Sequence, residues 1–339
     1  MSFDGTSWVT ANPSFTEPNI LNQINQRSDF IKLMAGGAPR VRLGSEDKYV
    51  YIKQLAVRTK VSSGASGSNQ VPSCSITTGL ASAPTYLQQV RAIFDRHQEA
   101  MAGHWGVNLM DAQRLGMRQG HYQLLRNKFF FGEQPANGEG VLNGTGITTI
   151  TLPADPYGAT TISTYDNGAM ALFLLSIVQG LKTRTFQHGE PQKIVVVGPQ
   201  QVISLWQMVA IVQLVAYQRP GAGSATTAGT VQDILERNGD EIIWGYDDTL
   251  LTAGAGGTNA IVFGMPELKK QDGDGWNTNE FGKVGPNFLD NTVMYSDLAA
   301  PLEIVSPMEQ GKTDMFTEIR ATSGWPVRPE ATTVLSAAF

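Results

Sequence analysis

The sequence predicts an α+β protein, and three observations support this class. Two β-rich runs flank a polar stretch of small residues in the first third of the chain, and a long polar helix pattern follows them. From about residue 150 onward, apolar helix patterns alternate with short buried-strand runs, which is α/β in character. Residues 315–339 predict two further strands around a turn at residues 324–326.

The composition is that of a globular chain long enough for two or three domains. The 339 residues are 41% hydrophobic and 16% charged. No stretch reaches about 18 uninterrupted apolar residues, and the N-terminus has neither a basic start nor an apolar core, so neither a membrane span nor a secretory signal is expected. Cys74 is the only cysteine, which excludes an intrachain disulfide and favours a reducing cytoplasm.

The first part of the chain predicts an arm and then an extended hairpin. Residues 1–47 are rich in Pro, Asn, Ser and Gly and hold one short amphipathic piece, residues 19–34. Residues 47–61 and 85–94 are β-rich, and the 62–79 segment between them has no core-forming run. We expect these runs to pair as one hairpin over residues 48–96. The second run also fits helical spacing, so a helix is the alternative there.

A long helix is predicted over residues 108–131. Asn108 is a good N-cap, and Asp111 lies where a negative charge favours a helix start. Gly132 is the natural stop. The helix surface is basic because of Arg114, Arg118, Arg126 and Lys128.

The second half predicts two apolar helices and three buried strands. The helices are expected over residues 166–184 and 199–217. The strands are expected at residues 193–198, 240–246 and 259–265.

No pattern of catalytic, cofactor-binding or metal-binding residues emerges. The glycine-rich segments 221–229 and 254–257 lack the Gly-Lys-Ser/Thr ending of a phosphate-binding loop, and residues 272–280 have the wrong spacing for a calcium loop. No helix-turn-helix, zinc-finger or RNA-binding motif is present. The histidines lack the spacing of a helical zinc site; they are His97, His104, His121 and His188. We therefore expect no enzyme, no cofactor and no metal.

The charge is divided unevenly along the chain. Residues 1–131 hold 14 Lys and Arg against 8 Asp and Glu, whereas residues 132–339 hold 11 against 22. This asymmetry favours contacts between copies of the chain, or one face turned toward a polyanion. Two ordinary solvated faces explain it equally well.

The order of these parts, with the motifs "GEGVLN" at residues 138–143 and "SGWPVRPEA" at residues 323–331, resembles the major capsid proteins of tailed bacteriophages. Encapsulins share this fold. The resemblance implies an N-terminal arm (1–47), an extended loop (48–96), a peripheral domain (97–153 and 313–339) with a spine helix (108–131), and an axial domain (154–312).

The resemblance also implies roles for particular residues. Lys53, Arg58, Lys60 and Cys74 would lie on the extended loop that contacts neighbouring subunits. The basic residues of the spine helix, Arg114, Arg118, Arg126 and Lys128, would face packaged DNA. The domain junction would comprise Phe129, Gly140, Val141, Leu142 and Asn143, with the phenylalanines of residues 129–131 anchoring the helix end in the peripheral core.

The implied function is a structural subunit that assembles into the icosahedral head shell around the double-stranded DNA of a tailed phage. Its partners would be its own copies in hexamers and pentamers, unspecific DNA, and scaffolding, portal and decoration proteins, with no membrane. It would be part of the virion and assemble in the bacterial host cytoplasm. The alternatives are an encapsulin-like storage shell and an α/β enzyme whose pocket lies among the strands of residues 160–265.

Overall fold

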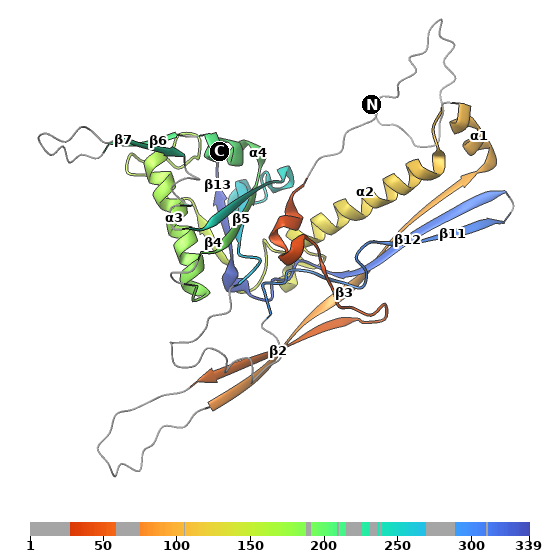
Figure 1. Ribbon diagram of the computed structural model, residues 1–339, viewed down its shortest axis with the longest axis horizontal. Helices are drawn as coiled ribbons and strands as arrows, with labels where there is room; N and C mark the ends of the chain where they lie inside the picture. The colour runs from red at the N-terminus through yellow and green to blue at the C-terminus, as the bar shows by residue number, and fades with distance from the viewer. Residues whose placement is uncertain are drawn as a thin grey trace, which may run out of the picture.

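The computed structural model describes residues 28–58, 75–104, 106–187, 191–208, 210–214, 226–230, 236, 239–268, 289–309 and 311–339. The described fold has a compact end and a long, thin end (Figure 1). Its helices are α1 (Arg96–His104), α2 (Leu109–Phe130), α3 (Asn167–Arg184) and α4 (Gln200–Met208). The short 3-10 helix η1 (Phe30–Leu33) precedes the first strand.

The strands form one long sheet, one compact sheet and one small ribbon. The long sheet contains β1 (Arg40–Val41), β2 (Tyr49–Arg58), β3 (Ser75–Asp95), β10 (Tyr295–Ser296), β11 (Leu302–Glu309) and β12 (Lys312–Thr322). The compact sheet contains β4 (Thr148–Thr151), β5 (Lys193–Gly198), β8 (Glu241–Tyr246), β9 (Asn259–Gly264) and β13 (Thr332–Ala337). The ribbon is made of β6 (Ala210–Leu214) and β7 (Thr226–Thr230).

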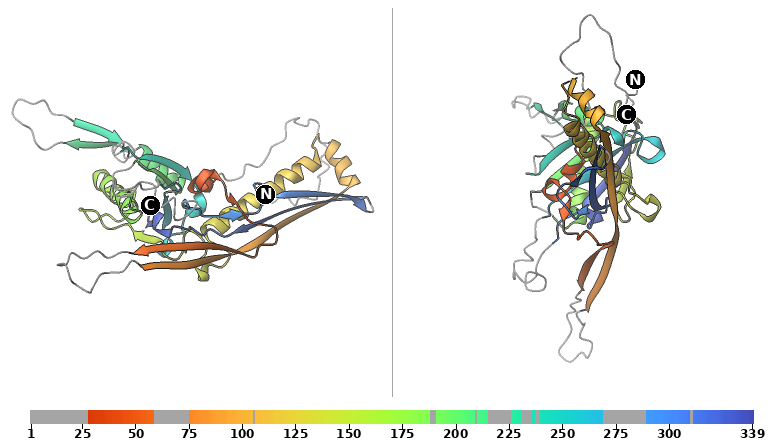
Figure 2. Two further views of the ribbon diagram at one scale, coloured as in Figure 1. Left: turned by 60° about the horizontal axis from the view of Figure 1, so that its bottom comes forward. Right: turned by 90° about the vertical axis from the view of Figure 1, so that its right-hand side faces the viewer.

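The long strand β3 serves two partners in succession. From Thr85 to Asp95 it pairs antiparallel with β12, and from Ser75 to Pro84 it pairs antiparallel with β2. The β2–β3 part therefore leaves the sheet as a separate ribbon (Figures 1 and 2). The predicted hairpin is confirmed, and the helical alternative for residues 85–94 is wrong because each of these residues has a partner on β12.

Helix α2 lies along the β3–β12 part of the long sheet (Figure 1). Met117 of α2 packs in a small buried cluster with Phe94 of β3 and Met315 of β12. The period of two along both strands places one set of their side chains toward the helix and the other set on the opposite face. Glu318 and Arg91 lie on that opposite face, and neither is buried.

The compact sheet has the order β4-β13-β9-β5-β8 and is buried on both faces. Ile194 and Val196 of β5 face a core that includes Leu174 and Leu181 of α3. Val195 and Val197 face a second core, which also contains Phe129 and Phe130 of α2. Burial on both faces explains why β5 is an uninterrupted apolar run rather than an alternating pattern.

The second half of the chain departs from the predictions at one element. The helix expected over residues 199–217 ends at Met208 as α4, and Ala210–Leu214 form β6, paired with β7. A continuous apolar run does not distinguish a helix from a strand by periodicity, so the pairing partner decided this segment. The helix at residues 166–184 and the strands at 193–198, 240–246 and 259–265 are confirmed.

The strand pairing also crosses the predicted domain boundaries. β13 follows β12 in sequence, but it pairs with β9 in the compact sheet, and β4 joins it there. Conversely, β10 and β11 pair with β12 in the long sheet, although they precede residue 313. The pairing thus places β4 and β13 with a strand of the predicted axial domain, and β10 and β11 with a strand of the predicted peripheral domain. The division into these two domains stays a prediction.

Candidate functional site

The ends of α2 are set by local capping. The Asn108 side chain accepts a hydrogen bond of 3.3 Å from the backbone N–H of Asp111, which satisfies one of the free donors of the first turn. At the other end, Gly132 follows the C-cap residue Phe131 and has a φ of 76°. The predicted start and stop of this helix are therefore confirmed.

The phenylalanines at the end of α2 join the helix to the compact sheet. Phe129 and Phe130 are fully buried, with their ring centroids 5.1 Å apart, and Phe30 of η1 lies 5.3 Å from Phe129. Their cluster includes Val195 and Val262 from the compact sheet. The cluster also includes Val141 and Val334, so it contains residues from both sides of the predicted domain boundary. The placement of these rings within a peripheral core stays a prediction.

A crossing of three backbone segments follows the phenylalanines. Val141 N–H donates to the Phe129 carbonyl at 2.9 Å, and Gly140 N–H donates to the Gly324 carbonyl at 2.8 Å. Gly324 N–H in turn donates to the Lys128 carbonyl at 3.0 Å. The glycines of the two motifs thus lie at one backbone contact.

Two other predicted junction residues lie beside this crossing. Leu142 N–H donates to the Phe130 carbonyl at 3.0 Å, and its side chain packs against the second core. The exposed Asn143 donates its side-chain Nδ2–H to the Phe131 carbonyl at 3.3 Å. The structure therefore brings the predicted junction residues together at the end of α2.

A buried carboxylate completes the junction. Glu139 Oε1 accepts a hydrogen bond of 2.7 Å from Tyr86 Oη, and Oε2 accepts from Ser323 Oγ at 2.9 Å and from Gln134 N–H at 3.0 Å. Burial, together with the hydrogen bond and charge of Glu139, raises the pKa of Tyr86 above its usual range. Glu139 was not among the predicted junction residues, although a lone acid between two glycines was the available signal.

We expect Glu139→Gln to lower the free energy of unfolding by about 1 to 3 kcal/mol, because the amide cannot accept hydrogen bonds from all of its present donors. Chemical denaturation followed by circular dichroism measures the change. Glu46→Gln is the matched control, since Glu46 is exposed and its substitution removes the same charge. Equal stability of the two variants would contradict the structural role of Glu139.

The basic surface of α2 is smaller than the sequence indicates. Lys128 is buried, with its Nζ 3.0 Å from Glu133 Oε2 and 5.1 Å from the centre of the Tyr86 ring. Arg126 is only 7% exposed, and its Nε and Nη1 have no hydrogen-bond partner among the described residues. In this conformation neither side chain presents its charge to solvent, which contradicts the expected DNA-facing position of both.

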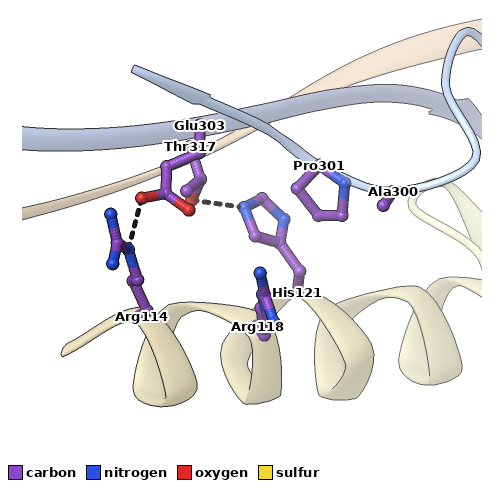
Figure 3. Close-up of a pocket in the computed structure, with 7 residues that line it drawn as sticks. All are labelled: Arg114, Arg118, His121, Ala300, Pro301, Glu303 and Thr317. Atoms are coloured by element: carbon purple, nitrogen blue, oxygen red, sulfur yellow. Dashed lines mark hydrogen bonds and ion pairs between the residues drawn. The ribbon is translucent and has the colours of Figure 1, made fainter. Parts of the chain in front are cut away.

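The other two arginines border a pocket between α2 and the β11–β12 hairpin (Figure 3). Arg114 is half-buried; its Nε donates to Glu303 Oε1 at 2.6 Å, and its Nη1 lies 3.2 Å from Asp111 Oδ1. The hydrogen bond to Glu303, with that to Asp111, raises the pKa of Arg114. Arg118 is exposed and forms no ion pair with any residue of the described ranges.

His121 forms the deep wall of this pocket. It is 1% exposed, its Nε2 lies 2.9 Å from Thr317 Oγ1, and its Nδ1 is buried without a partner in the described part of the chain. Burial lowers the pKa of His121, and a hydrogen bond to the Thr317 backbone acts in the opposite direction. The cavity volume is about 340 Å³, and its lining residues are Arg114, Arg118, His121, Ala300, Pro301, Glu303 and Thr317.

The ribbon formed by β2 and β3 exposes an apolar face. Tyr49, Tyr51 and Leu80 are 54%, 61% and 63% exposed. The register pairs Lys53 with Leu80 and Tyr51 with Ser82, so these side chains share one face. The predicted assembly residue Lys53 lies on this same face and is exposed.

The remaining predicted loop residues are only partly covered by the structure. The backbone of Arg58 pairs with Ser75 at the end of the ribbon, and the position of its side chain is not described. Lys60 and Cys74 lie outside the described residues.

The described ranges offer neither a membrane span nor a metal centre. No helix there is long and apolar enough to span a bilayer. The same residues contain no group of three or more His, Cys, Asp or Glu side chains able to hold a metal ion.

Comparison with known proteins finds similarity in structure but not in sequence. No family model and no curated protein matches the chain. The capsid of Myoviridae phage XM1 superposes with a TM-score of 0.64 at 13% identity, covering 98% of this chain and 100% of that one. The capsid of the native GTA particle gives 0.54 at 10% identity, covering 97% and 96%. The capsid of cyanophage P-SCSP1u gives 0.52 at 14% identity, covering 96% and 93%. The chain therefore has the tailed-phage major capsid protein fold.

Proposed function

We propose that this chain is a major capsid protein that assembles into the icosahedral head shell of a tailed phage and encloses its double-stranded DNA. The observation that carries the proposal is the exposed apolar face of the β2–β3 ribbon in a chain whose whole length superposes on a phage capsid. An isolated two-stranded ribbon is marginally stable in water, and its open edges and apolar face favour pairing with another chain. In a closed shell, neighbouring copies supply that partner.

The proposed partners follow from the shell. Copies of the chain would associate as hexamers and pentamers, with scaffolding, portal and decoration proteins as further partners. The protein would be part of the virion and would assemble in the bacterial host cytoplasm. We further propose that the long sheet with α1 and α2 forms the peripheral domain, and that the compact sheet with α3 and α4 forms the axial domain. The pairing of β13 with β9 supports this revised boundary.

Contact with the enclosed DNA would be electrostatic and unspecific. Arg118 is the member of the predicted basic set that combines an exposed side chain with the absence of a described ion pair. Each phosphate neutralised by such a side chain adds about one unit to the salt dependence of binding. The DNA-facing role is therefore proposed for Arg118 rather than for the four residues together.

We expect the full-length chain, expressed alone or with a scaffolding protein, to form large closed or partial shells. Light scattering and negative-stain imaging measure assembly, and nuclease protection of particles formed in the presence of DNA measures enclosure. A compact monomer under every assembly condition would contradict the proposal. Shells that enclose protein cargo and protect no DNA would favour an encapsulin-like compartment instead.

A further inference from the structure

Strand β11 forms an open edge of the long sheet. It pairs with β12 along one side (Figure 1), and no strand among the described residues pairs with its other side. Its regular part carries apolar side chains that reach solvent: Leu302, Ile304 and Val305 are 45%, 44% and 38% exposed. Natural proteins protect edge strands with charged residues, because an apolar open edge pairs with strands of other chains. β11 is therefore expected to have a partner strand outside the subunit.

The register shows which backbone groups β11 offers to that partner. β3 occupies one side of β12 along its whole length, so β10 and β11 share the other side. On this side, Asp297 N–H donates to the Arg320 carbonyl at 3.0 Å. Because backbone polar groups alternate along a strand, the even-numbered residues of β12 face β11, and their even-numbered partners in β11 face β12. The N–H and C=O groups of Glu303 and Val305 then point away from the sheet.

Two copies of this edge can pair antiparallel about a twofold axis through Ile304. Each Glu303 then lies opposite Val305 of the other copy, and the two residues exchange N–H···O bonds in both directions. An axis through Glu303 would bring two carboxylates opposite each other, which is unfavourable. An axis through Val305 would carry the pairing past Ser306 into the bulge of β11. The axis through Ile304 keeps the pairing within residues 302–306, where β11 is regular.

Two prolines confine the contact to this stretch. Pro301 and Pro307 lie at equal distances in sequence on either side of Ile304, and neither has a backbone N–H. In the antiparallel pair, Pro301 of each copy is opposite Pro307 of the other, so the ladder of hydrogen bonds stops at both ends. The contact is therefore short, and its register is fixed.

The side chains at this contact are complementary. Leu302 and Ile304 project from the face of the long sheet opposite α2, as their partners on β12 do. Across the axis the two Ile304 side chains meet, and each Leu302 lies diagonal to Ile304 of the other copy, which forms a continuous apolar row. Glu303 lies on the α2 face, where Arg114 Nε donates to its Oε1 at 2.6 Å. The one charge of residues 302–306 is therefore compensated inside its own subunit.

We propose that β11 is the site of a twofold contact, in which it pairs antiparallel with β11 of a second copy and joins the two long sheets into one. A twofold contact is saturated by two copies, whereas contacts within a ring of subunits are head-to-tail. The β11 contact therefore cannot close a hexamer or a pentamer. It would link a subunit of one ring to a subunit of the next, and this role, unlike the contact itself, rests on the proposed function.

The first test uses the twofold axis itself, at which a side chain meets its own counterpart. Ile304→Lys and Ile304→Glu each bring like charges together, so association of either full-length variant should weaken about tenfold or more relative to the wild-type chain. An equal mixture of the two brings opposite charges together and should restore association. Sedimentation velocity measures the fraction of chain above the monomer. A mixture that associates no better than either variant alone would overturn the proposal.

Ile93→Lys and Ile93→Glu are the matched controls. Ile93 is 51% exposed on the same face of the long sheet, but it lies on β3 rather than at the β11 edge. These variants should associate like the wild-type chain, and mixing them should change nothing. Circular dichroism should show an unchanged unfolding midpoint for every variant, because both isoleucines are exposed. An equal loss of association by the Ile93 variants would assign the effect to general charge repulsion and refute the contact.

The second test detects the contact directly by disulfide formation. Opposed residues of a non-hydrogen-bonded antiparallel pair have Cα atoms about 4.5 Å apart, which lies within the range of a disulfide. The Cys74→Ser background removes the natural cysteine. In it, Ile304→Cys should form a disulfide-linked dimer on mild oxidation, and Ile93→Cys should form much less. Equal yields from the two would contradict the proposal, and a partner strand other than β11 would leave Ile304→Cys without a dimer.

The outcomes separate this contact from the proposed function. Disulfide-linked dimers from an Ile304→Cys chain whose wild type forms no shells would support the β11 contact and count against the proposed function. Normal shells from Ile304→Lys, together with no dimer from Ile304→Cys, would count against the β11 contact alone.

Discussion

Gly140→Ala is expected to lower the free energy of unfolding by about 2 to 5 kcal/mol. Gly140 has a φ of 87°, which costs a residue with a side chain about 1 to 2 kcal/mol. A Cβ atom there would also lie 2.5 Å from the Phe131 carbonyl carbon and 2.6 Å from the Phe130 carbonyl oxygen. Both atoms are backbone at the end of α2, so relief requires a shift of the helix end, and overpacking of this kind costs a further 1 to 3 kcal/mol or so.

Gly158→Ala separates the two causes. Gly158 has a φ of 90°, nearly equal to that of Gly140, but nothing lies within 4 Å of the position that a Cβ atom would take there. Gly158→Ala should therefore lower the free energy of unfolding only by the conformational cost of about 1 to 2 kcal/mol. Urea denaturation monitored by circular dichroism measures both variants. Equal losses would mean that the close backbone crossing contributes nothing measurable.

Removal of the β2–β3 ribbon is expected to abolish shell assembly while the subunit stays folded. Val50 and Ala83 are opposite each other in the ribbon, so an Asn-Gly turn between them can replace residues 51–82. The strand pairs removed join β2 only to β3, and none of the residues in the buried clusters lies in the deleted segment. The unfolding midpoint should therefore change little, whereas the yield of particles should fall to background.

A shorter deletion identifies the part of the ribbon that matters. Arg58 and Ser75 are also opposite each other, so a turn between them removes only residues 59–74 and leaves both described strands intact. Assembly by the short variant and not by the long one would assign the contact to residues 51–58 and 75–82, which include Tyr51 and Leu80. Wild-type shells from both deletions would show that the ribbon is not an assembly element. Particle counts by negative stain and circular dichroism of the same samples provide the two readouts.

The sequence predicted the elements whose signals are local. Asn108 and Gly132 marked the two ends of α2 because capping depends on residues within one turn. The small-residue segment between two β-rich runs indicated a hairpin because no core-forming residue interrupts it. The motifs at residues 138–143 and 323–331 indicated the fold, and in the structure they meet at the Gly140–Gly324 hydrogen bond.

The errors concern properties that depend on partners distant in sequence. Residues 210–214 are apolar enough for a helix, and their pairing with β7 makes them a strand. In the sequence, Lys128 and Arg126 resemble part of a solvated basic face, yet both are buried, and Lys128 contacts Glu133 and the Tyr86 ring. The sequence did not indicate the burial of His121 or its pocket, because both depend on Pro301 and Thr317, nearly 200 positions away.

The sequence by itself determined where α2 begins and ends, that a long hairpin projects from the chain, and which fold the order of parts resembles. The helix ends and the hairpin depend on backbone capping, on β propensity and on the lack of core residues, which act over a few neighbouring positions. The fold was indicated by the resemblance that the order of parts and the two motifs carry. Only the tertiary structure decided that β13 belongs to the compact sheet, that Glu139 lies buried at the junction, and that Arg118 and His121 share a pocket. Strand partners, burial and unpaired donors are properties of surfaces brought together by folding, so no single stretch of the sequence contains them.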